Sequence, residues 1–78
     1  MHTLDDLPDG QEGVLEALRV AEDIGARLME MGFVPGARVV ATHCAPSGDP
    51  RVFEVDGSAI ALRRETARRL LVRPPESP

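Results

Sequence analysis

The sequence predicts a small, mainly β barrel built from about five short strands and one long helix. The strand-like segments are bounded by clusters of turn-forming residues, above all the proline–glycine pair at 35–36 and the aspartate–glycine pair at 56–57. Five short strands in a chain of 78 residues cannot build a two-layer sandwich. Curling them into a barrel removes the exposed edges that a flat sheet would present.

Length and composition indicate one soluble domain. With 78 residues, of which 42% are hydrophobic and 28% charged, the chain has room for one core. Cys44 is the only cysteine, which excludes an internal disulfide and favours a reducing cytoplasm. The N-terminus lacks a signal-peptide pattern, and the longest apolar runs, such as Ala59–Leu62, fall far short of the roughly 18 residues that span a bilayer. We expect a cytoplasmic protein that is not inserted into the membrane.

The charge balance argues against a nucleic-acid binder. The net charge is −4, and all nine basic residues are arginine. Proteins that bind nucleic acid or an anionic membrane are generally basic. The two phenylalanines are expected in the core, and without tyrosine or tryptophan no platform remains for stacking bases. We therefore expect no nucleic-acid partner.

The first quarter of the chain is expected to form a lead-in and a strand. Leu4 and Leu7 lie three residues apart before a proline and a glycine, so we expect both to be pinned onto the core before the chain turns. From Gly13 to Arg19 the side chains alternate in two sets, which predicts a first strand, although helix propensity is nearly as good there.

The long helix is predicted over Ala21–Met31. Its expected core face carries Ile24, Leu28 and Met31, at helical spacing. Gly25 would cost about 1 kcal/mol relative to alanine inside a helix, so the sequence leaves the start of the helix open.

A glycine stop and a tight turn are predicted to end this helix. Gly32 stands where a chain leaving a helix needs a positive φ, and Phe33 stands where a Schellman motif packs it back on Leu28. Pro35-Gly36 then supplies the backbone angles of a type II turn.

Three further strands are predicted after this turn. Ala37–Ala45 is the first, and a loop rich in turn formers, Ser47–Pro50, follows it. Arg51–Val55 and Ser58–Leu62 are joined by Asp56-Gly57, the signature of a type I′ hairpin. The residues expected on one face of these strands are Phe53 and Val55, then Ile60 and Leu62.

The end of the chain is expected to close the barrel. Arg63–Arg69 predicts one or two turns of helix containing Ala67, and Leu70–Val72 a closing strand. We expect a domain over residues 1–73 and a disordered tail over 74–78. One helix between the first two strands and a short helical turn before the last strand fit an SH3-like barrel.

The sequence around the helix stop resembles the signature of the FeoA family. The matching residues are Arg27-Leu28-x-x-x-Gly32-Phe33-x-Pro35-Gly36-x-x-Val39. The second half extends the resemblance through Gly48-Asp49-Pro50, Val55, Gly57, Ile60-Ala61-Leu62-Arg63, Ala67 and Val72. FeoA proteins are small bacterial proteins encoded beside the ferrous iron importer FeoB. The same module resembles the C-terminal domain of diphtheria-toxin-repressor-type metal regulators.

The resemblance implies a non-enzymatic accessory protein of ferrous iron uptake. Its implied partner is the membrane importer FeoB, with its cytoplasmic GTP-binding domain, and no cofactor is implied. A second hypothesis is a stand-alone SH3-like module of a metal-dependent transcription regulator, which would bind peptide or a transition metal. The chain holds no winged-helix DNA reader, which argues against it. The oligomeric state stays open.

The sequence predicts neither a catalytic nor a metal site. No nucleophile stands beside an evident base, and no glycine-rich phosphate loop precedes a helix. His43 and Cys44 are neighbours on one strand, so they point to opposite faces and cannot share a metal. The competing hypothesis is weak metal binding through His43 and scattered carboxylates.

Two surfaces are candidates for binding a partner protein. The first is an apolar patch at the helix end, rimmed by charges; it comprises Arg27, Met29, Glu30, Phe33 and Val34. The second is a basic cluster near the C-terminus, which could attract an acidic partner; it comprises Arg63, Arg64, Arg68 and Arg69, with Arg73 beyond. For this cluster the simpler interpretation is a solvated face, with Glu65 as a pairing partner.

Overall fold

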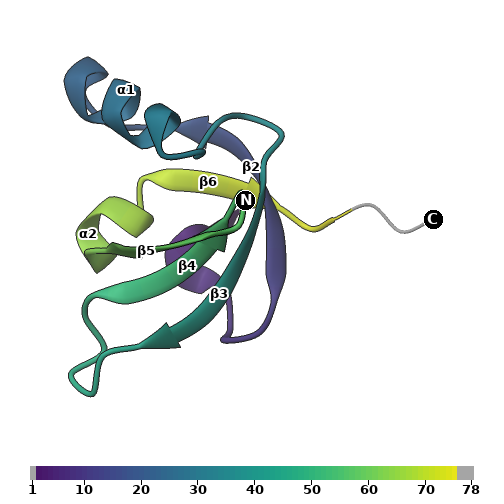
Figure 1. Ribbon diagram of the computed structural model, residues 1–78, viewed down its shortest axis with the longest axis vertical. Helices are drawn as coiled ribbons and strands as arrows, with labels where there is room; N and C mark the ends of the chain where they lie inside the picture. The colour runs from purple at the N-terminus through teal and green to yellow at the C-terminus, as the bar shows by residue number, and fades with distance from the viewer. Residues whose placement is uncertain (1, 76–78) are drawn as a thin grey trace.

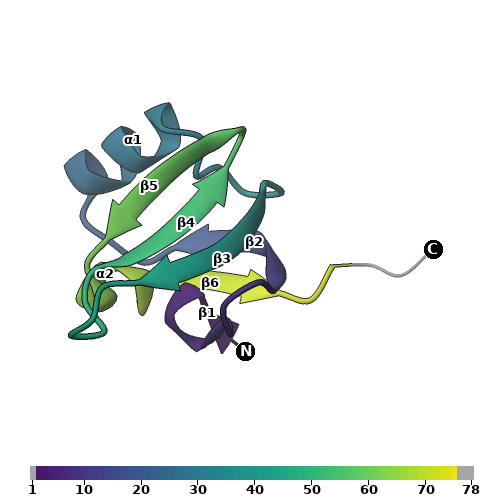
Figure 2. The same ribbon diagram turned by 60° about the horizontal axis from the view of Figure 1, so that its bottom comes forward.

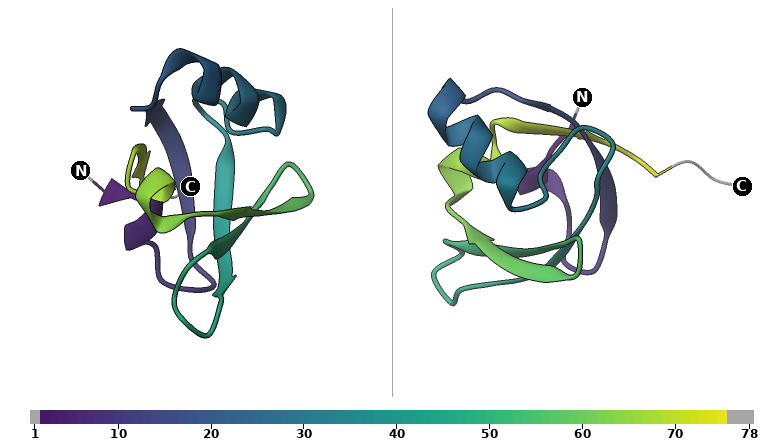
Figure 3. Two further views of the ribbon diagram at one scale, coloured as in Figure 1. Left: turned by 90° about the vertical axis from the view of Figure 1, so that its left-hand side faces the viewer. Right: turned by 45° about the horizontal axis from the view of Figure 1, so that its top comes forward.

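Six antiparallel strands form one curved sheet in the order β1-β6-β2-β3-β4-β5 (Figure 1). The structure is a computed structural model, in which residues 2–75 are described. Helix α1 lies across the mouth of the curved sheet (Figure 3). The strands are β1 (His2–Thr3), β2 (Glu12–Leu18), β3 (Arg38–Cys44), β4 (Arg51–Val55), β5 (Ser58–Leu62) and β6 (Leu70–Arg73). The helices are the 3₁₀ turn η1 (Leu4–Asp6), α1 (Glu22–Glu30) and α2 (Arg64–Ala67).

The predicted mainly β class is confirmed, but the sheet has one strand more than expected and is not closed. β4 and β5 have their predicted bounds, and the other predicted elements differ by one or two residues at an end. The additional strand is β1. It and β5 are the two edges of the sheet, and no strand pairing joins them within residues 2–75 (Figure 2). β1 is only two residues long before the chain bends into η1, so it is too short to pair with β5 and close the sheet.

Of the predicted tail, residues 76–78 lie outside the described residues.

The core lies inside the curve of the sheet. Phe33 and Phe53 are its largest side chains, and both are fully buried. Leu4 is fully buried and Leu7 packs against the core, which confirms the predicted lead-in. The glycine at position 13 makes room for this packing, because a Cβ atom there would lie 3.3 Å from Leu7 Cδ1 and from the Cβ atom of Val72.

A Schellman motif ends α1, as predicted. Gly32 has a φ of +106°, and its N–H donates to the Met29 carbonyl at 3.0 Å. The Phe33 N–H donates to the Leu28 carbonyl, also at 3.0 Å. These hydrogen bonds satisfy carbonyl groups that a helix end otherwise leaves unpaired. Leu28 and Phe33 are both buried, so this end of the helix is anchored in the core.

The turn at Pro35-Gly36 has the predicted geometry. The Ala37 N–H donates to the Val34 carbonyl at 2.9 Å, and Gly36 has a φ of +92°. Two further hydrogen bonds tie the turn to β2: Gly36 N–H to the Leu15 carbonyl at 2.7 Å, and Leu15 N–H to the Ala37 carbonyl at 2.9 Å. The turn therefore fixes the helix end against the start of β3.

The predicted core face of α1 is wrong for two of its three residues. Leu28 is buried, but Ile24 and Met31 are 44% and 37% exposed. The periodicity correctly indicates an amphipathic helix, yet only the last turn of α1 lies against the core. Open hollows of about 510 and 630 Å³ flank the rest of the helix. The helix begins at Glu22, so Gly25 lies inside it.

The gap between the two sheet edges is bridged by a buried arginine. Arg51 of β4 is 8% exposed, and its guanidinium lies 5.4 Å from the ring centre of Phe53. It donates to the Asp5 carbonyl at 2.8 Å, the Leu7 carbonyl at 2.6 Å and Asp9 Oδ1 at 2.9 Å. Arg51 therefore fastens the N-terminal segment across the open side of the sheet.

Asp5 is the second member of this bridge. Its side chain is 8% exposed, and Arg64 of α2 contacts it with Nε at 3.0 Å and Nη2 at 3.2 Å. Arg68 adds a hydrogen bond from Nε at 3.2 Å. Burial alone raises the pKa of Asp5, but the hydrogen bonds and charges of the two arginines outweigh it and hold the pKa below its ordinary value. We call Asp5, Arg51, Arg64 and Arg68 the Asp5 cluster.

None of the helices within residues 2–75 is long and apolar enough to cross a membrane.

Two glycine-to-alanine variants, one just beyond the end of α1 and one inside it, should have opposite effects on stability. Gly32→Ala should lower the free energy of unfolding by about 1–2 kcal/mol, because alanine disfavours a positive φ. Its Cβ atom would also lie 3.2 Å from the Cβ atom of Asp56. Gly25→Ala is the matched control and should raise the free energy of unfolding by up to about 1 kcal/mol. Urea unfolding measures both, and equal effects of the two variants would contradict the assigned helix end.

Removing the charge of Asp5 should weaken the fold in a pH-dependent way. At pH 7, Asp5→Asn should lower the free energy of unfolding by about 1–2 kcal/mol, a value reduced by the exposure of Arg64 and Arg68. A lowered carboxyl pKa stabilises the fold above the pKa of the unfolded chain, about 3.9, and this contribution is lost as the pH falls through the folded pKa.

The difference between wild type and Asp5→Asn should therefore be constant from pH 7 to about 5 and shrink below about 4. Urea unfolding at several pH values tests this. Glu12→Gln, which breaks the exposed pair with Arg38, is the control and should cost less than about 0.5 kcal/mol. A difference that does not depend on pH would contradict the assigned role of Asp5.

Candidate functional site

An open groove of about 970 Å³ lies where the end of α1 faces the hairpin of β4 and β5. One wall comes from the last turn of α1 and the turn that follows it, and the other from the hairpin and the start of β3. We call it the helix-end groove. The side chains used below are Met29, Glu30, Met31 and Val34 on the first wall, and Arg38, Asp56 and Ile60 on the second.

The helix-end groove exposes apolar side chains beside charged ones. Met29 and Val34 are 44% and 41% exposed, and Met31 lies between them in sequence. A group of exposed large apolar side chains with a charged rim is typical of a protein-binding surface. Arg38 pairs with Glu12 at 3.2 Å, whereas no ion pair of Glu30 or Asp56 is found within residues 2–75. The rim is therefore acidic on balance.

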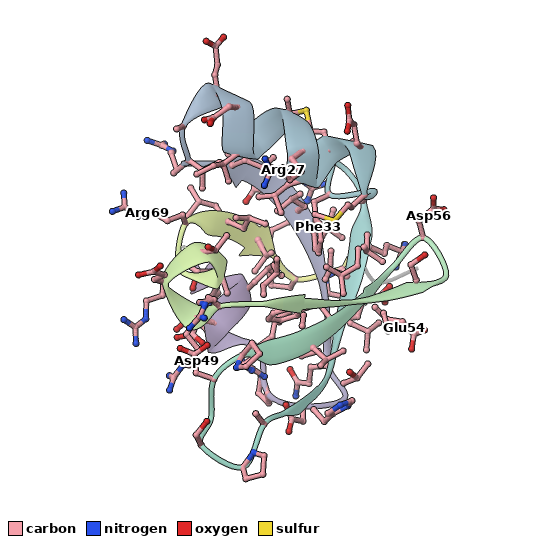
Figure 4. The ribbon with its side chains drawn as sticks, turned by 60° about the vertical axis from the view of Figure 1, so that its left-hand side comes forward. Arg27, Phe33, Asp49, Glu54, Asp56 and Arg69 are labelled. Carbon is pink, nitrogen blue, oxygen red and sulfur yellow. The ribbon has the colours of Figure 1, made fainter. Side chains whose placement is uncertain are left out.

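The structure brings three of the five predicted helix-end residues together. Met29, Glu30 and Val34 line the groove. Arg27 is exposed on α1 but is not part of the lining. The prediction that Phe33 contacts a partner is wrong for this structure, because its side chain is fully buried beneath α1 (Figure 4). Phe33 instead positions the residues on either side of it.

The arginine cluster does not form one free basic surface. Arg64 and Arg68 bind Asp5, a partner that the sequence did not indicate. Arg63 and Arg69 are exposed, and neither makes an ion pair within the described residues. In Figure 4, Arg69 and Asp56 lie at opposite sides of the molecule, so Arg69 is far from the helix-end groove. The two predicted surfaces are therefore separate.

Sequence reasoning missed two apolar residues of the groove. Its spacing from Leu28 predicts that Met31 lies in the core. It is the C-cap of α1, and the chain turns away at Gly32 before that face reaches the sheet. Ile60 is only partly buried, because β5 is an edge strand. The glycine stop was the one available signal that the apolar face ends before Met31.

His43, the candidate for weak metal binding, lies on β3 beside Thr42. His43 is exposed, and its Nδ1 lies 3.2 Å from Thr42 Oγ1. The same hydroxyl donates to the Val52 carbonyl at 3.1 Å. Within residues 2–75 no three His, Cys, Asp or Glu side chains are grouped so that they could hold a metal ion.

Comparison with known proteins identifies a family. The model of the FeoA domain matches residues 2–74. The chain is 32% identical over 69 residues to the Fe(2+) transport protein A/Fe(2+) transporter FeoB fusion protein of Porphyromonas gingivalis, and the match covers 88% of this chain but only 8% of that protein. It is 27% identical over 70 residues to the putative Fe(2+) transport protein A of Campylobacter jejuni, covering 90% and 95% of the two chains.

A solved structure agrees with the fold. FeoA of Stenotrophomonas maltophilia, a prokaryotic SH3 domain protein crystallised with zinc, is similar with a TM-score of 0.82 at 35% identity. The match covers 94% of this chain and 91% of that one. The predicted SH3-like architecture is therefore confirmed, apart from its closure. Since the family model spans almost the whole chain and the fold agrees, the chain belongs to the FeoA domain family.

Proposed function

We propose that this protein is a non-enzymatic accessory protein of ferrous iron uptake that acts by binding the cytoplasmic part of the iron importer FeoB. Membership of the FeoA domain family supports the first part. The second part is supported by the Porphyromonas gingivalis relative, whose name describes a fusion of Fe(2+) transport protein A with the transporter FeoB. The proposed location is the cytoplasm, at the inner face of the membrane where the partner lies.

The observation that carries the proposal is the helix-end groove. Its exposed side chains Met29, Met31 and Val34 lose contact with water when a partner covers them. Burying each such apolar side chain is worth roughly 1–2 kcal/mol at about 25 cal/mol per Å². The acidic balance of the rim, from Glu30 and Asp56, favours a partner segment that combines apolar side chains with a basic one.

Hydrogen bonds within the fold hold part of the groove in place before a partner binds. The first wall of the groove is held by two turns: Gly32 is fixed by the Schellman motif, and the Pro35-Gly36 turn is hydrogen-bonded to β2. A surface held in place before binding loses little conformational entropy on binding. Arg27, exposed on α1 outside the groove lining, and the exposed Arg63 and Arg69 are proposed as secondary contacts.

Substitutions in the groove should weaken binding to FeoB. Met29→Asp and Val34→Asp should each lower the affinity at least tenfold, since each places a carboxylate in an apolar contact. Ile24→Asp is the matched control: Ile24 lies on the same helix, is also 44% exposed and is not part of the groove lining. The affinity of this variant should stay within about twofold of wild type. Co-purification and calorimetry with full-length FeoB in detergent measure these values.

Two results would count against the proposal. No binding of wild type to FeoB would remove the partner itself. Equal loss of affinity in the Ile24 and Met29 variants would move the contact away from the groove. In cells, deletion of the gene should lower ferrous iron uptake, and the Ile24→Asp variant should restore uptake better than Met29→Asp.

A further inference from the structure

β5 forms one edge of the sheet, and this edge lacks the usual protection. Edge strands of natural proteins are generally very short, or carry charges, prolines or bulges that prevent pairing with another chain. β1, at the other edge, is two residues long. β5 is five residues long, and its sequence Ser58-Ala59-Ile60-Ala61-Leu62 contains neither a charge nor a proline. Its register with β4 is continuous, whereas irregularities interrupt the β2–β6 and β3–β4 ladders.

The register shows which backbone groups of β5 are free. Val55 and Ser58 face each other across the two-residue turn, and in such hairpins this pair is hydrogen-bonded. Hydrogen-bonded pairs alternate along the ladder, so Ile60 and Leu62 also bond to β4. The N–H and C=O groups of Ala59 and Ala61 therefore point away from β4, and they make no other backbone hydrogen bond within residues 2–75. Their methyl side chains are too small to cover these groups.

Two unpaired charges of opposite sign flank this edge. Asp56 precedes β5 and Arg63 follows it; both are exposed, and neither forms an ion pair within the described residues. Figure 4 shows Asp56 at the tip of the hairpin. An antiparallel strand that lies beside β5 satisfies both charges when it is acidic at its N-terminal end and basic at its C-terminal end. β5 with its flanking residues has this charge order itself.

We propose that β5 pairs with β5 of a second copy of this chain, antiparallel and centred on Ile60. Ala59 of one copy then lies opposite Ala61 of the other, and each such pair exchanges both hydrogen bonds. The two Ile60 side chains meet on the face that borders the helix-end groove. In this register Arg63 of one copy lies opposite Gly57 of the other, next to Asp56 of that copy. The contact is self-complementary, as a two-fold dimer requires, and it joins the two sheets into one.

The dimer should be weak, and the inference does not depend on the proposed binding to FeoB. One short strand pair buries less area than the roughly 1,600 Å² of a standard interface. A dissociation constant of roughly 10 μM to 1 mM is therefore expected. Sedimentation of the wild-type protein from about 10 μM to 1 mM should show its mean mass rising from monomer towards dimer with concentration.

A proline substitution tests the edge directly. Ala61→Pro removes an N–H that points outward, so the ladder with β4 keeps its hydrogen bonds. The variant should self-associate at least tenfold more weakly than wild type, with a thermal unfolding midpoint close to that of wild type. Ala61→Ser keeps the N–H and is the matched control, which should self-associate like wild type.

A charge variant gives an independent test that leaves the backbone untouched. Arg63→Glu places a carboxylate near Asp56 of the second copy, so self-association should weaken several-fold. Adding Asp56→Asn removes this repulsion and should restore part of the loss.

Three results would overturn the proposal. The first is that the wild-type protein stays monomeric up to 1 mM. The second is that the Ala61→Pro and Arg63→Glu variants associate as tightly as wild type. The third is that Val34→Asp abolishes the dimer while Ala61→Pro does not. The last result would place the contact between copies in the helix-end groove.

Discussion

The burial of Phe33 directly after a glycine stop is the constraint on which most of the structure depends. Its ring fills the core beneath α1, and its N–H closes the last turn of the helix through the Leu28 carbonyl. Because Phe33 points inward, its neighbours Met31 and Val34 are left at the surface on either side of it. The exposed apolar groove is thus a direct consequence of the buried anchor. A packing requirement and a candidate binding surface arise from the same few residues.

The features that could be predicted from the sequence are those encoded within a few consecutive residues. The glycine stop, the turn at Pro35-Gly36 and the hairpin at Asp56-Gly57 each follow from backbone angles that few residues adopt. The features that could not be predicted join distant parts of the chain. Arg64 and Asp5 are 59 residues apart, and β1 pairs with the last strand. No local pattern indicates such a partner, so the sequence alone predicts a solvated or partner-binding surface for the arginines near the C-terminus.

The periodicity of α1 shows a second limit of local patterns. The spacing of apolar residues predicts that a helix has one apolar face, but it does not indicate how much of that face packs against the rest of the protein. Only the last turn does so here, through Leu28. Of the predicted helix-end residues, Met29, Glu30 and Val34 line the groove, whereas Phe33 is buried. Met31, which the helical period places in the core, lies at the surface.

The uneven packing of α1 has a consequence for its local stability. Its last turn is buried through Leu28, and Val20, just before its first turn, packs against the core, whereas Ile24 between them is 44% exposed. Segments with few buried apolar contacts open locally at a lower free energy than the whole protein unfolds. The middle of α1 is therefore the part of the helix where local opening costs least.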